Sequence, residues 1–232
     1  MKWGTKYGPD YVNNLRAMVR RHLTLPHRLI CFTDDGRGLE AGIEVMPLPA
    51  MDLAAGKERG WRKLSTFTAP LADLKGPVLF LDVDILIVGS LDCFFDHPGR
   101  FCIIRDWAKP WRGTGNSSVY RFEANAHPDL LAHFLAQADQ VKREVRNEQE
   151  YLTREIHRQE MLTFWPGEWC VSFKYHCLPR FPLNFFRTPR LPTNARVVVF
   201  HGHPLPEEAI AGRNRNLLRR PRPTPWIADH WR

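Results

Sequence analysis

Hydrophobic residues in the first third of the chain alternate between helical spacing and short continuous runs. Apolar side chains at positions 11, 12, 15, 18, 19 and 23 form a helical stripe over 9–23, which ends before Pro26. Short apolar runs at 28–33 and 43–49 predict two strands, and 61–74 predicts a helix that leads into the apolar run 78–89. This alternation is typical of an α/β fold with a mostly parallel central sheet flanked by helices.

The rest of the chain has a less regular pattern. We expect strands at 101–104 and 117–122, helices at 128–139 and 147–159, and a strand at 195–200 that runs into the stretch HGHP. No internal repeat is present, which excludes a solenoid. We therefore predict one domain over 1–212, followed by a basic tail containing proline and tryptophan over 213–232.

Composition narrows the class of protein. The 232 residues are 44% hydrophobic and 25% charged, as in a globular protein, and no apolar run approaches the roughly 20 residues that span a bilayer. No apolar signal-peptide region follows Met1, and the five cysteines form no CxxC pair. We therefore expect a cytoplasmic protein without a disulfide framework.

The net charge of +8 favours an anionic partner. Five of the arginines lie in the segment RNRNLLRRPR, 213–222, where they flank two leucines. This tail is suited to peripheral contact with anionic lipid at the inner membrane face, and the alternative is an ordinary solvated tail. A nucleic-acid-binding protein would also be basic, but no recognisable module supports that class, so we expect no nucleic acid partner.

Two carboxylates interrupt the most apolar segment, VLFLDVDILIVG at 78–89. In a strand, Asp82 and Asp84 would project to the same side, and their neighbours predict a strand covered on both faces. Buried carboxylates need a compensating positive charge, and two hard oxygen ligands at this spacing suit Mn²⁺ or Mg²⁺. The alternative is that the strand ends at Leu81 and the aspartates cap a turn.

The stretch LDVDILIVGSLDCFF resembles the corresponding segment of the glycogenin-like (family eight) glycosyltransferases and related bacterial sugar transferases of GT-A fold. The resemblance implies that Asp82 and Asp84 bind manganese and that this stretch, with Val83, contacts the diphosphate of a nucleotide sugar. It also implies the GT-A type of α/β fold. That fold begins with a strand, for which only MKWG is available, so the strand is very short or the true start lies upstream of Met1.

Two further stretches resemble the family's donor-binding segments. WRKLSTF is similar to a helix whose lysine, here Lys63, lies near the diphosphate and sugar, although Lys63 also suits a solvated helix position. GPDYVNNL is similar to the stretch whose tyrosine meets the nucleotide base, which implies Tyr11 and less directly Tyr7. Tyr11 belongs to the apolar stripe as well, so packing in the core is an equal alternative.

Later stretches resemble the reaction centre. GNSSVYRF implies that Asn116 and Ser117 face the donor sugar, and NEQEYL places Glu148 and Gln149 where the family has an Asp-Gln pair. VVVFHGHP resembles the strand that supplies a metal-binding histidine, here His201 with His203 behind it, and a glycine, Gly202, to the diphosphate loop. The family's Lys-Pro-Trp after this glycine is missing here, and the alternative is a simple loop.

The resemblance implies a metal-dependent hexosyltransferase that uses a nucleotide-diphosphate sugar, a UDP-sugar by preference, and a hydroxyl acceptor with retention. The acceptor is expected to be a saccharide or a lipid-linked saccharide. Four tryptophans could stack on acceptor sugars or serve in packing: Trp107, Trp111, Trp165 and Trp169. A nucleotidyltransferase or a haloacid-dehalogenase-type phosphohydrolase could use the same Asp-x-Asp site, although in the latter the motif ends the first strand.

Overall fold

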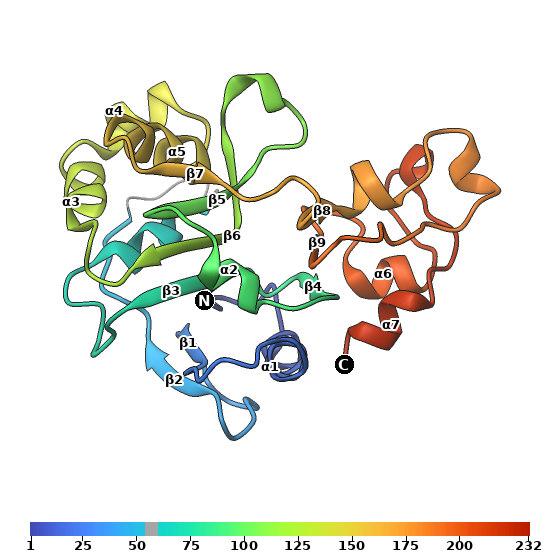
Figure 1. Cartoon of the computed structure of the whole chain (residues 1–232), viewed down its shortest axis with the longest axis horizontal. Coiled ribbons are helices and arrows are strands. Elements are labelled where there is room, and N and C mark those ends of the chain that lie inside the picture. Colours follow the sequence, from blue (N-terminus) through green and yellow to red (C-terminus); the bar gives the residue numbers. More distant parts are fainter. Residues whose placement is uncertain (54–59) are drawn as a thin grey trace. The chain divides into compact units, whose positions relative to one another are not determined.

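The computed structural model describes residues 1–53 and 60–232. Its internal contacts divide the chain into two compact units, whose elements are labelled in Figure 1. Unit 1 consists of Met1, Met46–Leu81 and Phe94–Trp165. Unit 2 consists of Lys2–Val45, Asp82–Cys93 and Pro166–Arg232. Both units are therefore assembled from segments that are far apart in the sequence.

Unit 1 is built around a four-stranded sheet in the order β3-β6-β5-β7. The strands are β3 (Pro77–Leu81), β5 (Phe101–Arg105), β6 (Gly115–Glu123) and β7 (Leu162–Phe164). β6 is antiparallel to β3 and β5, whereas β7 is parallel to β5. The helical segments are η1 (Trp61–Phe67), η2 (Pro110–Arg112), α3 (Pro128–Ala136), α4 (Ala138–Glu144) and α5 (Glu148–Arg158).

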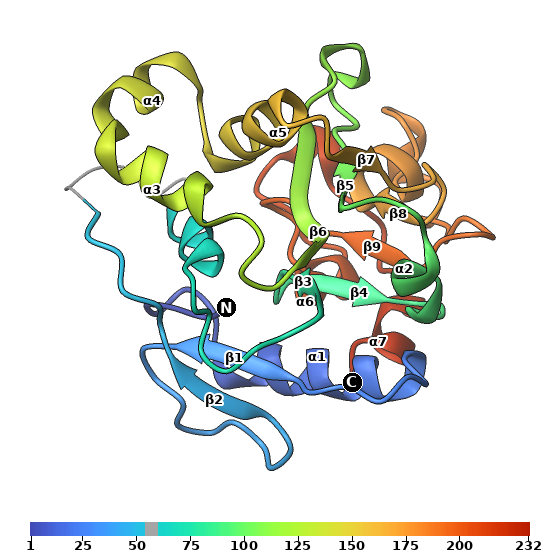
Figure 2. The same ribbon diagram turned by 60° about the vertical axis from the view of Figure 1, so that its left-hand side comes forward.

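The packing of unit 1 follows from the apolar faces of these elements. α5 packs against β6 and β7, and α3 packs against η1 (Figure 2). In the buried core the Tyr120 ring stacks with the rings of Phe67, Phe80 and Phe101, and the Phe67 ring is tilted against that of Phe101. Because burial of aromatic rings removes large apolar areas from water, this cluster fixes β3, β5, β6 and η1 together.

Unit 2 contains a three-stranded sheet in the order β4-β9-β8. Its strands are β4 (Ile85–Ile87), β8 (Cys170–Ser172) and β9 (Val197–Val199), with β4 antiparallel and β8 parallel to β9. α1 (Pro9–His22) packs on β4, and β1 (Ile30–Thr33) pairs with β2 (Glu44–Pro47), which begins in this unit. The smaller elements are η3 (Phe173–Cys177), η4 (Leu183–Phe185), α6 (Pro206–Ile210), η5 (Leu217–Arg219) and α7 (Trp226–His230), and α2 (Asp92–Asp96) begins in this unit.

Most elements with strong local periodicity were predicted correctly. α1, α3 and α5 lie within the expected helices, and β1, β2, β5, β6 and β9 coincide with expected strands. The apolar stripe of α1 is buried, as its spacing predicts. Lys2 forms a parallel bridge with Thr33, so the MKWG stretch does pair with β1, over a single residue. The five cysteines form no disulfide.

Three predictions of architecture were wrong. The sheets are mixed rather than mostly parallel. The helix expected over 61–74 is a 3-10 helix that ends at Phe67, because Pro70 cannot continue a helix and disfavours helical backbone just before it. The single strand expected over 78–89 is two strands, β3 and β4, that pair in different sheets.

Among the described residues, no helix is both long and apolar enough to cross a membrane. The segment expected to be a tail, 213–232, supplies η5 and α7 to unit 2. α7 packs against α6 and β4, and Ile227 within it is fully buried. This segment is therefore part of the packed structure of the unit.

Candidate functional site

Five of the predicted site residues meet in unit 1. The Ser117 hydroxyl donates to Glu148 Oε1, and Lys63 Nζ lies 3.9 Å from the same oxygen. Lys63 Nζ also donates to the carbonyl oxygen of Ser117 at 3.2 Å and to its hydroxyl at 3.3 Å. Asn116 Nδ2 donates to Gln149 Oε1 at 3.5 Å. We call these residues the unit 1 cluster: Lys63, Asn116, Ser117, Glu148 and Gln149.

Local structure explains how the Glu148 carboxylate enters this cluster. Glu148 begins α5 directly after the N-cap residue Asn147, whose side chain accepts from the Glu150 amide at 3.2 Å. A carboxylate in the first turn is favoured by the helix dipole. On the opposite side, Gly60 has a φ of 82°, and a Cβ there would lie 2.6 Å from Glu148 Oε2. Gly60 therefore satisfies a positive φ and leaves space for the carboxylate.

An irregularity in β6 presents Asn116 and Ser117 to the cluster. The pairing of β5 with β6 shifts between Ile103, which opposes Tyr120, and Ile104, which opposes Asn116. Such a bulge redirects the side chains of the strand that carries it. The Asn116 side chain also accepts from the Ser118 amide at 3.1 Å, which fixes its orientation.

The predicted metal-binding aspartates lie in a turn of unit 2. Asp82, Val83 and Asp84 connect β3 to β4, and both carboxylates are half-buried. The strand geometry assumed for the pair is therefore wrong, and the alternative that the strand ends at Leu81 describes the backbone. Tyr7 donates its hydroxyl to Asp84 Oδ2 at 2.5 Å.

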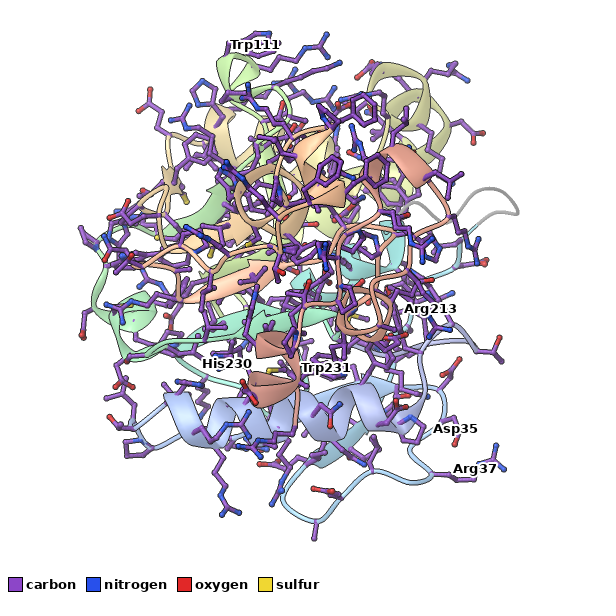
Figure 3. All side chains as sticks on the ribbon, turned by 90° about the vertical axis from the view of Figure 1, so that its right-hand side faces the viewer. Asp35, Arg37, Trp111, Arg213, His230 and Trp231 are labelled. Carbon is purple, nitrogen blue, oxygen red and sulfur yellow. The ribbon has the colours of Figure 1, made fainter. Side chains whose placement is uncertain are left out.

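The two predicted tyrosines differ in their surroundings. Burial, followed by the charge of Asp84, raises the pKa of Tyr7, so this half-buried phenol stays protonated and donates to the aspartate. Tyr11 is only 7% exposed and lies in a hydrophobic cluster with Val83, while its hydroxyl donates to Glu207 at 2.7 and 2.8 Å. Trp231, which directly follows α7 and is labelled in Figure 3, packs edge-on against the Tyr11 ring.

These contacts bear on the donor-binding predictions for Tyr11 and Val83. Tyr11 is packed in a buried hydrophobic cluster, as the packing alternative expects. Burial, followed by the hydrogen bond to Glu207, raises the pKa of Tyr11. The Val83 side chain is 6% exposed, so a contact with a ligand there would fall to its backbone. Tyr7 is the more accessible of the two rings.

His201 follows β9 in unit 2, where its Nε2 lies 2.7 Å from the Ser172 hydroxyl. Its ring stacks with that of Tyr175, and its carbonyl oxygen accepts from Lys174 Nζ. Burial, followed by the positive charges of Lys174 and Arg219, lowers the pKa of His201 to about 4. The imidazole is consequently neutral near pH 7 and keeps a lone pair for a ligand.

The chemistry of the predicted metal ligands fits a hard divalent ion only in part. Carboxylate oxygens and a neutral imidazole are suitable donors for manganese. Among the described residues, however, no three His, Cys, Asp or Glu side chains lie together in a group that could hold a metal, so Asp82, Asp84 and His201 do not form one. The assignment of these three residues as ligands stays a prediction.

Several contacting residues were not expected from the sequence. Ser172, Lys174 and Tyr175 surround His201, and Glu207 binds Tyr11. No local motif in the sequence singles out Ser172, Lys174 or Tyr175. Trp165 is buried and donates its indole N–H to the Val119 carbonyl, as the packing alternative expects, whereas Trp111 is 78% exposed (Figure 3).

Comparisons of structure identify the fold. The galactosyltransferase LgtC in complex with donor and acceptor sugar analogs superposes with a TM-score of 0.56 at 13% identity, covering 85% of each chain. An active-site mutant of LgtC gives a TM-score of 0.56 at 14% identity, again over 85% of each chain. The glycosyltransferase GlyE of Streptococcus pneumoniae TIGR4 gives 0.62 at 12% identity, covering 99% of this chain and 59% of that one.

These similarities confirm the GT-A type of α/β fold expected from the resemblance. No protein-family model matches the sequence. No curated protein matches it significantly either.

Proposed function

We propose that the chain is a metal-dependent glycosyltransferase that moves a hexose from a UDP-sugar to a hydroxyl acceptor with retention. The observation that carries the proposal is the unit 1 cluster. Its members come from three segments, near 63, 116 and 148, that the resemblance to sugar transferases predicts as parts of one site. The fold shared with LgtC and GlyE supports the same reaction class, as does the LgtC complex with donor and acceptor sugar analogs.

In the proposed reaction, the bond from the anomeric carbon to the diphosphate breaks and a bond to the acceptor oxygen forms. The acceptor's proton passes to the departing diphosphate. Asn116 and Gln149 offer amide groups that can orient sugar hydroxyls, and Glu148 holds the Lys63 ammonium in a fixed position. Retention and the preference for uridine rest on the resemblance alone.

Asp82 and Asp84 would hold the divalent ion, with His201 as the predicted third ligand. When bound, such an ion supplies positive charge to the diphosphate leaving group. Tyr7 keeps Asp84 oriented through its hydroxyl. The neutral state of His201, which follows from its lowered pKa, favours ligand binding over repulsion of a cation.

A donor screen tests the proposal. The protein is incubated with nucleoside-diphosphate sugars, a saccharide acceptor and Mn²⁺, and free nucleoside diphosphate is measured. We expect release with at least one donor, loss of release with a chelator, and loss in Asp84→Asn. Equal release by Asp84→Asn would contradict the metal assignment. Pyrophosphate released from a nucleoside triphosphate would instead identify a nucleotidyltransferase, and cleavage of an aryl phosphate a phosphohydrolase.

We also propose that unit 2 contacts anionic lipid at the cytoplasmic membrane face. Two apolar side chains of η5, Leu217 and Leu218, are 67% and 60% exposed between the arginines of 213–222. Exposed leucines flanked by arginines suit a bilayer interface, where the apolar groups insert and the cations meet headgroups. We expect binding to vesicles containing phosphatidylserine but not to neutral vesicles, and loss of binding in a Leu217→Ser, Leu218→Ser variant.

A further inference from the structure

Lys174 is a half-buried cation of unit 2. It lies in η3, directly after β8, and its ammonium donates to the His201 carbonyl oxygen. Neither Lys174 nor Arg219 has a carboxylate partner within residues 1–53 and 60–232. The acids of neighbouring α6 are engaged elsewhere, since Glu208 binds His203 at 2.7 Å and Glu207 binds Tyr11. A partly desolvated ammonium without a counter-charge is unfavourable unless a ligand supplies one.

A second positive charge acts at the same place. Arg219, in η5, is exposed, and its positive charge acts on the Lys174 ammonium. Two cations that repel each other form a locally positive surface. Such an arrangement is costly in the unliganded protein and becomes favourable when an anion is bound.

The backbone next to Lys174 is open to a ligand. Gly202 is exposed and has a φ of 75°, and a Cβ built on it would lie 3.6 Å from Lys174 Nζ. The ammonium therefore borders an exposed stretch of chain that carries no side chain. The segment 201–212, which contains Gly202 and α6, has no lysine or arginine of its own.

We propose that Lys174, assisted by Arg219, binds the diphosphate group of the nucleotide beside Gly202. This inference rests on the proposed function and assigns diphosphate binding to Lys174, which no sequence motif selects, and to one arginine of the segment 213–222. An ammonium and a guanidinium are the two side chains that bind phosphate oxygens most strongly, the latter in bidentate geometry. Anionic lipid headgroups share this chemistry, so the test separates the two sources.

The test measures binding of UDP in the presence of Mn²⁺ by calorimetry. We expect Lys174→Ala and Lys174→Gln to weaken UDP binding by about tenfold or more, since each loses a charge-assisted hydrogen bond. Lys174→Arg should retain most of the affinity, and Arg219→Ala should show a smaller loss. Lys75→Ala, which removes an exposed lysine before β3, is the matched control and should bind UDP as the wild type does.

The outcomes distinguish the inference from the proposed function. Wild-type affinity for UDP in Lys174→Ala would overturn the inference and leave the glycosyltransferase proposal standing. The inference would also be overturned if Lys174→Ala bound UDP weakly but Lys174→Gln bound it as the wild type does. The lysine would then serve only to donate to the His201 carbonyl. Lys174-dependent binding of inorganic pyrophosphate without any binding of UDP would support the anion site and overturn the nucleotide-sugar function. Lys174-dependent binding of phosphatidylserine vesicles, with unchanged UDP binding, would overturn the diphosphate assignment.

Discussion

Glu148 is a buried carboxylate that is hydrogen-bonded by one neighbour and paired in charge with another. Its exposed fraction is 4%, and its oxygens contact the Ser117 hydroxyl and approach the Lys63 ammonium. Burial of a charge is unfavourable unless it is paired and hydrogen-bonded, so the three residues stabilise one another as a set. The same contacts keep the ammonium beside the Ser117 carbonyl, which gives the set a fixed geometry.

We expect Glu148→Gln to lower the free energy of unfolding by about 1–3 kcal/mol, because Lys63 loses its buried counter-charge. Release of nucleoside diphosphate should fall by about tenfold or more, since small displacements of site groups reduce rates strongly. Lys63→Met should have similar effects. In a double-mutant cycle by denaturant unfolding, the double variant should lose less than the sum of the single losses. Additive losses would show that the two charges do not interact.

His127 connects stability to pH at the level of one residue. It is 5% exposed and packs edge-on against Phe67 and Phe101. Burial lowers its pKa more than a hydrogen bond with Gln159 raises it. The unfolded chain then holds more protons than the folded one just below the unfolded pKa of about 6.5, so stability decreases as the pH falls through this range.

We expect His127→Phe to lose less stability than the wild type when the pH is lowered from 7.5 to 5.5, because this titration is removed while the aromatic packing remains. Urea unfolding at the two pH values measures the difference. His27→Gln, at an exposed position, should behave as the wild type does. An unchanged pH dependence in His127→Phe would mean that His127 is not the group responsible.

At the scale of elements, the turn at Asp82–Asp84 shows where sequence patterns were insufficient. Apolar residues on both sides of the turn predicted one strand, yet β3 pairs with β6 and β4 pairs with β9. Periodicity reports burial, and both strands are apolar, so nothing local distinguished one long strand from two short ones. The aspartates lie in the turn that connects β3 to β4, and polar residues are expected in turns.

Other elements were predicted because their signals are local. The apolar stripe of α1 and the capped start of α5 at Asn147 are contained within each segment. Sheet order, the antiparallel direction of β6 and the bulge beside Ser117 depend on residues far apart in sequence, which no pattern specifies. The residues of the unit 1 cluster were accordingly selected by the family resemblance alone, whereas Lys174 belongs to no recognised motif.

The bulged strand β6 also offers a test at this scale. A Cβ on Gly115 would lie 2.7 Å from Ile103 Cδ1 and 2.8 Å from Thr153 Oγ1, which accepts from the Gly115 amide. We expect Gly115→Ala to destabilise the protein by about 1–3 kcal/mol through overpacking. It should also lower the rate of nucleoside diphosphate release by shifting Asn116. Gly167→Ala, where a Cβ would meet nothing within 4 Å, should leave both unchanged.

At the scale of the whole molecule, the predicted site residues divide between the two units. Unit 1 carries the unit 1 cluster around Glu148. Unit 2 carries the predicted residues Asp82, Asp84, Tyr7, Tyr11 and the stretch 201–203. The groups suited to the metal and the nucleotide base thus belong to unit 2, and the groups suited to the sugar belong to unit 1, together with Lys63, which is predicted to lie near both the diphosphate and the sugar. Substitutions in unit 2 should mainly weaken nucleotide binding, and those in unit 1 should mainly reduce turnover.

Nucleotide and metal together should stabilise the folded protein. A ligand at 100 times its Kd contributes about 2.7 kcal/mol, which for a chain of this size corresponds to a rise in Tm of roughly 5 °C or more. We expect this rise with UDP plus Mn²⁺ and much smaller shifts with either alone, because the carboxylates of Asp82 and Asp84 would repel a diphosphate in the absence of a cation. A chelator should reverse the shift, and Asp84→Asn should abolish it in a thermal unfolding experiment. A full shift with UDP in the presence of chelator would mean that the diphosphate is held without a metal, by cations of the protein such as Lys174 and Arg219.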